Sequence, residues 1–116
     1  YAGPNGALCA FLDRLFYSDG KHMRYKPAAS VAVCRRGGAS ATFDRLNKYF
    51  TINCMPVVSS QYWNSVHGRA IGDAVQDEEG MQTMRTLAQN MAWMLQHLRG
   101  TELPVREDPI VTSFVR

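Results

Sequence analysis

The sequence AASVAVC at residues 28–34, followed directly by RRGG at residues 35–38, decides the fold class of this chain. A short apolar run that carries no charge on either face is typical of a strand buried within a parallel sheet. A second such run, MPVVSS, occupies residues 55–60, and its Pro56 fits near the start of a strand. The sequence therefore predicts two buried strands, at residues 28–34 and 55–60.

Three segments with apolar residues at helical spacing surround these strands. We predict helices over residues 7–17, from Ser40 or Thr42 through Phe50, and over residues 73–99, where Gly100 ends the last one. Strands that alternate with helices indicate an α/β fold with a parallel sheet. Two strands leave much of such a sheet exposed, so we expect an N-terminal segment, absent from this sequence, to supply the others.

The composition of the 116 residues indicates an ordinary globular protein, with 46% hydrophobic residues and a net charge of +3. Basic residues are scattered among acidic ones, which argues against a nucleic-acid surface, and no apolar run is long enough to span a membrane. The three cysteines, Cys9, Cys34 and Cys54, match neither a disulfide framework nor a zinc site. We read them as small buried residues and expect a cytoplasmic location.

Two loops are candidates for ligand binding because ligands of open α/β sheets bind beyond the carboxyl ends of the strands. The first loop, at residues 1–6, precedes a helix. The second loop, RRGG at residues 35–38, follows a buried strand. Backbone N–H groups in such turns attract negative charge, and glycines let a ligand approach the backbone. A plain capped turn and a solvated turn with surface arginines remain open as alternatives. The candidate binding residues are Tyr1, Ala2, Gly3, Asn5, Gly6, Arg35, Arg36, Gly37 and Gly38.

A third loop follows the second predicted strand and carries Tyr62, Trp63 and His67. The two aromatic side chains could stack on a ring and His67 could hydrogen-bond to it, on the substrate side of a site. Packing of the aromatics in the core or at a subunit interface, with a solvated His67, is the competing interpretation. The acids of residues 77–79 are explained by the dipole of the helix that they begin. No set of catalytic side chains or metal ligands can be assembled, so the chemistry of an enzyme here would come from a cofactor.

In their order and spacing, these features resemble the flavodoxin-like, NADPH-dependent FMN reductases, including the multimeric flavodoxin type and the flavoprotein part of iron–sulfur flavoproteins. The similar motifs are Tyr1-Ala2-Gly3-Pro4-Asn5-Gly6, Phe11-Leu12-Asp13-Arg14, Lys26-Pro27, Arg36-Gly37-Gly38, Thr42 to Leu46, Tyr62-Trp63, His67-Gly68 and Asp77-Glu78-Glu79-Gly80. The resemblance covers roughly residues 1 to 99.

The resemblance implies a doubly wound, five-stranded parallel sheet, of which this chain would supply about the last two strands and three helices. Residues 1–100 would be the C-terminal part of one domain, and residues 101–116 a tail. By resemblance, residues 1–6 line the flavin of FMN, and residues 35–38 cover the pyrimidine side of its ring. The loop that holds the FMN phosphate, and the cysteines that carry an iron–sulfur cluster in some relatives, would lie in the absent segment.

The function implied is that of an FMN-dependent oxidoreductase, which transfers hydride from NAD(P)H to FMN and on to a small acceptor, a flavin or a quinone. Two alternatives stay open. One is an electron carrier of the flavodoxin type, although such carriers tend to be acidic. The other is a non-catalytic interaction domain that kept the fold. The resemblance also implies a homo-oligomer, with neither a nucleic-acid nor a membrane partner.

Overall fold

A computed structural model describes residues 1–114 of the chain. Helix α1 spans Gly6–Asp19 and is followed by a short 3₁₀ helix, η1, at Gly20–Met23. Strand β1 spans Ala32–Cys34, helix α2 spans Ala39–Ile52 and strand β2 spans Ser65–His67. A second 3₁₀ helix, η2 at Asp73–Gln76, leads into the long helix α3 at Glu78–Leu98. The order of elements confirms the predicted α/β class with a parallel sheet.

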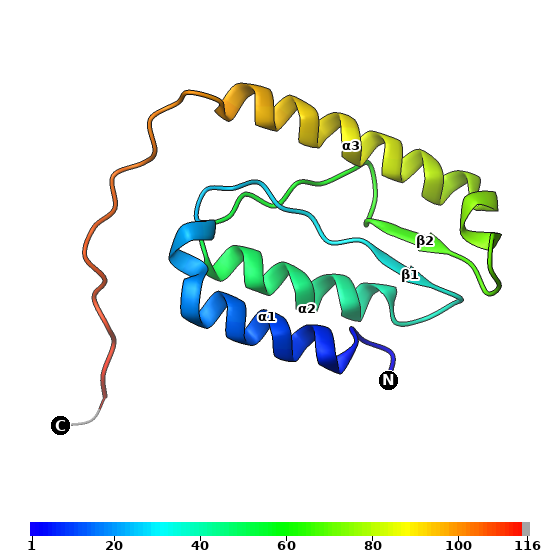
Figure 1. The fold of residues 1–116 in the computed structure, drawn as a ribbon, viewed down its shortest axis with the longest axis horizontal. Helices are drawn as coiled ribbons and strands as arrows, with labels where there is room; N and C mark the ends of the chain where they lie inside the picture. Colours follow the sequence, from blue (N-terminus) through cyan, green and yellow to red (C-terminus); the bar gives the residue numbers. More distant parts are fainter. Residues whose placement is uncertain (115–116) are drawn as a thin grey trace.

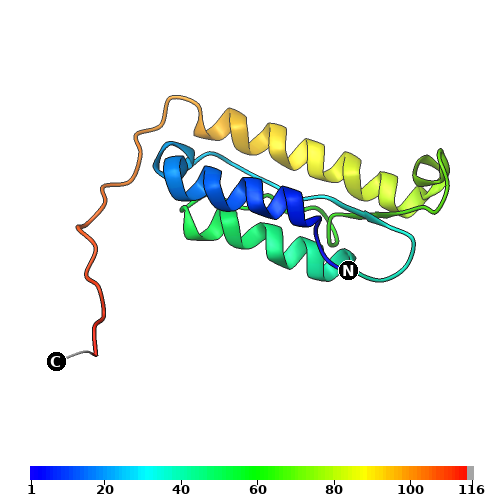
Figure 2. The same ribbon diagram turned by 60° about the horizontal axis from the view of Figure 1, so that its bottom comes forward.

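The helices lie on the two sides of a small parallel sheet. Helices α1 and α2 run side by side on one side of the strands, and α3 lies on the other, as the two ribbon views agree (Figures 1 and 2). Each of the three helices begins at the end of the molecule where β1 and β2 end (Figure 1). The first residues of all three helices therefore gather at the carboxyl edge of the sheet, which is where open α/β sheets bind their ligands.

The sheet differs from the prediction in the position of its second strand. Residues 55–60 make only one bridge, Ala28 with Val57, whereas the regular ladder pairs Ala32 with Ser65 and Cys34 with His67. The partner numbers differ by 29 at the bridge and by 33 in the ladder, so the second segment holds four additional residues. The predicted strand at 55–60 was therefore wrong as a continuous strand. Strand β2 lies in the segment that the sequence indicated as a loop.

The physical reason is a turn in the middle of the second segment. The Ser60 hydroxyl lies within hydrogen-bond distance of the Tyr62 carbonyl oxygen (2.5 Å) and of Asn64 Oδ1 (2.7 Å), so that the backbone leaves the ladder and returns at residue 65. Strand β2 contains a single apolar residue, Val66, which is too few to show the alternation of a strand. Within the first predicted strand, residues 28–34, only Ala28 and the residues of β1 pair with the second segment.

Helix starts also depart from the expected ones. Helix α2 begins at Ala39 after Gly38, whose φ of 95° places it in the left-handed region, and no side chain caps it. The expected cap at Ser40 or Thr42 was wrong, because both residues already lie inside the helix. The predicted helix over residues 73–99 is interrupted at Asp77, which accepts a hydrogen bond from the Gly80 backbone N–H and so starts α3. The expected end of this helix is confirmed, since Gly100 takes a φ of 75° just after it.

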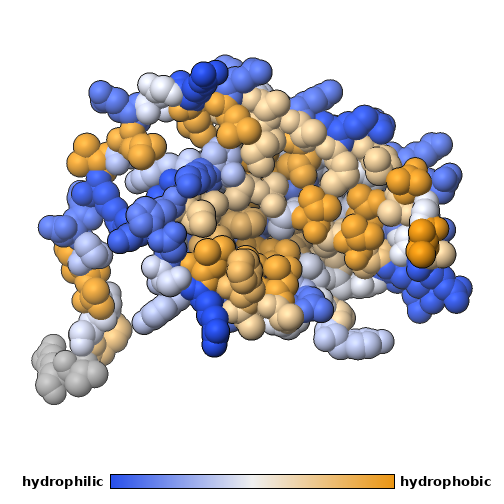
Figure 3. All heavy atoms as spheres, viewed as in Figure 1, coloured by the Kyte–Doolittle hydropathy of each residue, from blue (hydrophilic) through white to orange (hydrophobic). Residues whose placement is uncertain are grey.

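The core lies between the sheet and the helices, and part of β1 is left exposed to solvent. Val66 of β2 is 4% exposed beneath α3, whereas its ladder partner Val33 of β1 is 62% exposed. The described residues place no strand along the outer edge of β1. Apolar side chains accordingly remain open to solvent, and Figure 3 shows apolar atoms across the middle of the viewed face. The exposed apolar residues of α1 and of the β1 segment include Leu8, Phe11, Val31 and Val33.

Residues 101–114 form no helix or strand and project away from the helices (Figures 1 and 2). Their apolar side chains, among them Ile110 and Phe114, are exposed, whereas Val115, also part of the predicted tail, lies outside the described residues. The division into a domain at 1–100 and a tail at 101–116 stays a prediction. None of the helices within residues 1–114 is long and apolar enough to cross a membrane.

Candidate functional site at the carboxyl edge of the sheet

The structure brings the first two predicted loops into contact. A Cβ atom on Gly38 would lie 3.1 Å from Cα of Ala2 and 3.2 Å from its carbonyl carbon, so the two backbones pack closely there. Only glycine adopts the φ of 95° at this position without strain. Ala2 itself has a φ of 53°, which is uncommon for a residue with a side chain. Residues 36 apart in sequence thus form one continuous surface.

This surface encloses an open hollow of about 440 Å³, lined by Tyr1, Ala2, Arg35, Arg36, Gly37 and Gly38. All six are among the predicted binding residues. A Cβ atom on Gly37 would meet no other atom within 4 Å, so the space in front of this glycine is free. Gly3, Asn5 and Gly6, also predicted to bind, do not line the hollow. A flat ligand can therefore approach the backbone without displacing a side chain.

Asn5, one of the predicted binding residues, uses its side-chain oxygen to cap a helix. Its Oδ1 accepts hydrogen bonds from the backbone N–H groups of Ala7 (2.8 Å) and Leu8 (3.4 Å), which makes it the N-cap of α1. The side-chain oxygen is thus engaged by the helix. The alternative interpretation of this loop, a plain capped turn, is therefore correct for the Asn5 side-chain oxygen. The cap also sets where α1 begins.

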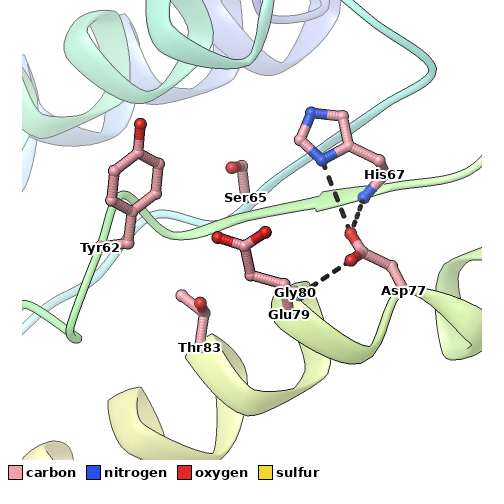
Figure 4. Close-up of a pocket in the computed structure, with 7 residues that line it drawn as sticks. All are labelled: Tyr62, Ser65, His67, Asp77, Glu79, Gly80 and Thr83. Atoms are coloured by element: carbon pink, nitrogen blue, oxygen red, sulfur yellow. Dashed lines mark hydrogen bonds and ion pairs between the residues drawn. The ribbon is translucent and has the colours of Figure 1, made fainter.

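A second cavity, of about 230 Å³, lies between β2 and the start of α3 (Figure 4). Tyr62 and His67, both predicted to lie on the substrate side of a site, line this cavity. Trp63 does not line it: its ring is 55% exposed and leans on Tyr62, with 5.1 Å between ring centroids. The full lining consists of Tyr62, Ser65, His67, Asp77, Glu79, Gly80 and Thr83.

His67 is held by Asp77 across this cavity. Asp77 Oδ2 accepts a hydrogen bond from the His67 backbone N–H at 2.7 Å and lies 3.5 Å from Nδ1 of the same residue. The other oxygen, Oδ1, accepts from the backbone N–H of Gly80 at 2.9 Å. Figure 4 shows the contacts of Asp77 with His67 and with Gly80. The second ring nitrogen of His67 points away from Asp77. Asp77 therefore does more than offset the helix dipole, which was its predicted role.

The carboxyl group of Asp77 is kept in its charged form by these contacts. Hydrogen bonds from the backbone N–H groups of Gly80 and His67 lower its pKa below the ordinary value of an aspartate, and they outweigh the opposing effect of burial. The pKa of Asp73 is lowered in the same way, because its Oδ2 accepts hydrogen bonds from the backbone N–H groups of Ala70 and Arg69. Both carboxylates are negative at neutral pH.

The wall of the cavity that carries Tyr62 is tied to α3 by amide side chains. Gln61 bonds to Gln82 (3.0 Å) and accepts a hydrogen bond from the Thr86 hydroxyl (2.8 Å). One helical turn farther on, Asn90 donates to the carbonyl oxygen of Ser59 at 2.8 Å. These bonds hold residues 59–62 against the helix, so Tyr62 keeps its place beside the cavity.

The α3 side of this cavity was not predicted from the sequence; it consists of Asp77, Glu79, Gly80 and Thr83. The signal present was the spacing Asp77-x-x-Gly80. An aspartate cap explains its first member, but only the fold explains its last. A Cβ atom on Gly80 would come 3.1 Å from Cα of Val66, so this glycine lets α3 pack directly on β2. The cysteines were also misread as buried: Cys54 is exposed, and Cys9 and Cys34 are partly exposed.

Comparison with known proteins assigns the chain. A family model described as NADPH-dependent FMN reductase matches residues 1–70, which is more than half of the chain and includes both glycine loops, Tyr62 and His67. The chain belongs to the NADPH-dependent FMN reductase family. This confirms the resemblance, and the two parallel strands with three helices agree with part of a flavodoxin-like domain.

A protein from Methanocaldococcus jannaschii named as an iron–sulfur flavoprotein is 32% identical to the chain over 80 residues. The aligned region covers 63% of this chain and 42% of that relative, so the chain spans less than half the length of the relative. No solved structure matches the chain.

Proposed function

We propose that the hollow between the two glycine loops binds the flavin of FMN. The observation that carries this proposal is the meeting of residues 1–2 with residues 35–38 around an open space of about 440 Å³, within the region that matches the family model. The unobstructed backbone at Gly37 and Gly3 fits a flat ring system. Tyr1, Ala2, Gly3, Asn5 and Gly6 would lie along one part of the flavin, and Arg35, Arg36, Gly37 and Gly38 along its pyrimidine part.

Bound FMN would accept hydride from NAD(P)H and pass electrons to a small acceptor. The contribution of this chain is electrostatic and geometric. Backbone N–H groups of the turn at 35–38, at the start of α2, favour negative charge, and Arg35 or Arg36 adds a positive charge beside the pyrimidine. The contact of Gly38 with Ala2 keeps the two loops in register with each other, so both present their backbone to the same ring.

The acceptor would enter on the side of β2. Tyr62 and His67 line the cavity there, and Trp63 stacks against Tyr62 at its rim. A side-chain cavity next to a cofactor loop is a feature of an enzyme with a small-molecule substrate more than of an electron carrier, which needs only an exposed cofactor edge. This supports the oxidoreductase over the carrier and over the non-catalytic domain.

The proposal includes the surroundings of the site. The open edge of β1 and the exposed Val31 and Val33 would be covered by further strands of the same sheet, which would also provide the phosphate loop. We further propose that the protein is a cytoplasmic homo-oligomer without nucleic-acid or membrane partners. Reduced pyridine nucleotides and three free cysteines suit such a reducing compartment.

The direct test is an absorbance spectrum of the purified full-length protein, with and without NADPH. We expect a flavin band that bleaches when NADPH is added. A protein that carries no flavin and takes up none from added FMN would overturn the proposal.

A substitution locates the flavin in the hollow. Gly37→Val places methyl groups into space that the protein itself leaves empty, so we expect an unchanged free energy of unfolding of the FMN-free protein and a loss of FMN affinity of at least about 100-fold. Ala41→Val, which adds the same two methyl carbons at an exposed position of α2 but not the Cβ atom that Gly37→Val also adds, should bind FMN normally. Equal FMN affinity in the two variants would place the flavin elsewhere.

A further inference from the structure

We propose that Nε2 of His67 delivers a proton to a quinone bound in the cavity between β2 and α3, and that Asp77 is the residue that positions His67 for this step. The inference rests on the proposed function, because the electrons must come from the reduced cofactor. Asp77 lies beyond the region that matches the family model, which ends at residue 70.

Asp77 contacts His67 at its backbone and at one nitrogen of its ring. Its Oδ2 binds the backbone N–H of His67 at 2.7 Å and faces Nδ1 of the ring at 3.5 Å. With Nδ1 turned toward the carboxylate, Nε2 is the ring nitrogen left to meet a ligand, and it points away from Asp77 (Figure 4).

Asp77 is itself held rigidly. Its Oδ1 caps α3 through the N–H of Gly80 at 2.9 Å, and Gly80 packs against the backbone of Val66, the residue just before His67. The start of α3, the carboxylate and the end of β2 are therefore joined by direct contacts. Such contacts favour a defined position for the proton donor, which proton transfer requires.

One residue of the cavity, His67, lies on the strand next to the one that leads into the loop proposed to bind flavin. His67 is the ladder partner of Cys34, and the N–H of Gly68 donates to the carbonyl oxygen of Cys34 at 3.1 Å. Neighbouring strands lie about 4.8 Å apart, and Arg35 follows Cys34 directly. An acceptor beside His67 would thus sit one strand away from the turn at residues 35–38.

Size and charge select the class of acceptor. A cavity of about 230 Å³ is smaller than the roughly 300–1,000 Å³ of drug-sized ligand sites, so it suits one small ring. The carboxylates of Asp77 and Glu79 disfavour anions, while the Tyr62 ring offers an aromatic wall. A neutral quinone has a flat ring for this wall and a carbonyl oxygen that can accept a proton from Nε2.

The step balances without any further reactant. Reduction of a quinone to a hydroquinone takes two electrons and two protons. Hydride from the reduced cofactor supplies both electrons and one proton. The second proton comes from His67: the Nε2–H bond breaks, an O–H bond forms at the quinone carbonyl oxygen, and the neutral imidazole then takes a proton from water.

The test compares two acceptors in the FMN-loaded full-length protein. Benzoquinone needs a proton, whereas ferricyanide takes only electrons. We expect His67→Gln to lower kcat with benzoquinone by about 100-fold, the usual size of general-acid catalysis, and Asp77→Asn to lower it less. The loss with ferricyanide should be much smaller in both variants. Asparagine preserves the helix cap, so the Asp77 variant should fold. Asp73→Asn is the matched control, since Asp73 also binds two backbone N–H groups but does not line the cavity.

A second measurement needs no cofactor. The ¹⁵N chemical shifts of the His67 ring report which nitrogen carries the proton, and we expect Asp77→Asn to change them while Asp73→Asn leaves them as they are. Equal losses with both acceptors, or none with benzoquinone, would overturn the role of His67. Unchanged ring shifts in Asp77→Asn would overturn the role of Asp77. Failure of the native protein to oxidise NADPH with either acceptor would instead overturn the proposed function, and this inference with it.

Discussion

The hollow between the glycine loops and the cavity under α3 lie at the same edge of the sheet but are built in opposite ways. Three of the six residues that line the hollow are glycine or alanine, and its two arginines, Arg35 and Arg36, are exposed. Polar side chains line much of the cavity. His67 bonds to Asp77 at the start of α3, and Gln61, the neighbour of Tyr62, bonds to Gln82 of α3. The difference shows that a backbone surface depends on which residues are small, whereas a side-chain cavity depends on how two elements pack.

Of the substitutions that test this comparison, one at Gly80 should change the free energy of unfolding most. In Gly80→Ala the added Cβ would lie 2.5 Å from Asp77 Oδ2 and 3.1 Å from Cα of Val66. Because helix or strand must shift, we expect a loss of about 2–3 kcal/mol in the free energy of unfolding, measured by urea denaturation of the full-length protein.

The matched control for Gly80 is Gly6→Ala. Gly6 is the first residue of α1, and a Cβ atom there meets nothing within 4 Å. Its stability should stay the same or rise slightly, because alanine is the better helix former. Equal stabilities of the two variants would show that α3 does not depend on close contact with β2.

A smaller effect is expected at Asn5, the N-cap of α1. Asn5→Ala removes the side-chain cap from the Ala7 and Leu8 backbone N–H groups and should cost about 1 kcal/mol of unfolding free energy. Asn5→Asp keeps an acceptor and should retain most of it. Loss of FMN affinity in both variants, with stability retained in the aspartate variant, would instead assign the Asn5 amide to the flavin.

The smallest effect is a dependence on acid. The pKa values of Asp73 and Asp77 are lowered in the folded protein, so their stabilising contribution is present above the unfolded pKa of about 3.9 and lost as pH falls through the folded value. We expect Asp73→Asn and Asp77→Asn each to flatten the decrease in stability below about pH 4. Urea denaturation between neutral pH and pH 3 measures it, and curves that stay parallel to the native one would contradict it.

Local patterns were enough to predict much of the fold. The charge-free run at residues 28–34 indicated a buried parallel strand, but only Ala32–Cys34 forms a regular strand and Val31 and Val33 are exposed. Glycines marked the turn at 37–38 and the end of α3. The position of β2 could not be predicted, because Ser65-Val66-His67 has one apolar residue and gains its strand conformation from pairing with Ala32–Cys34. Sequence spacing likewise cannot show that residues 59–62 leave the ladder to bond with Gln82, Thr86 and Asn90.

By itself, the sequence determined the α/β class and both glycine loops, because charge, apolar spacing and glycine act over a few neighbouring residues. Tertiary structure alone decided that Gly38 meets Ala2 and that Asp77 meets His67. The first contact requires two loops that follow different strands, and the second requires α3 to pack directly on β2 at Gly80. Such contacts arise from the register and packing of whole elements, which no single segment encodes.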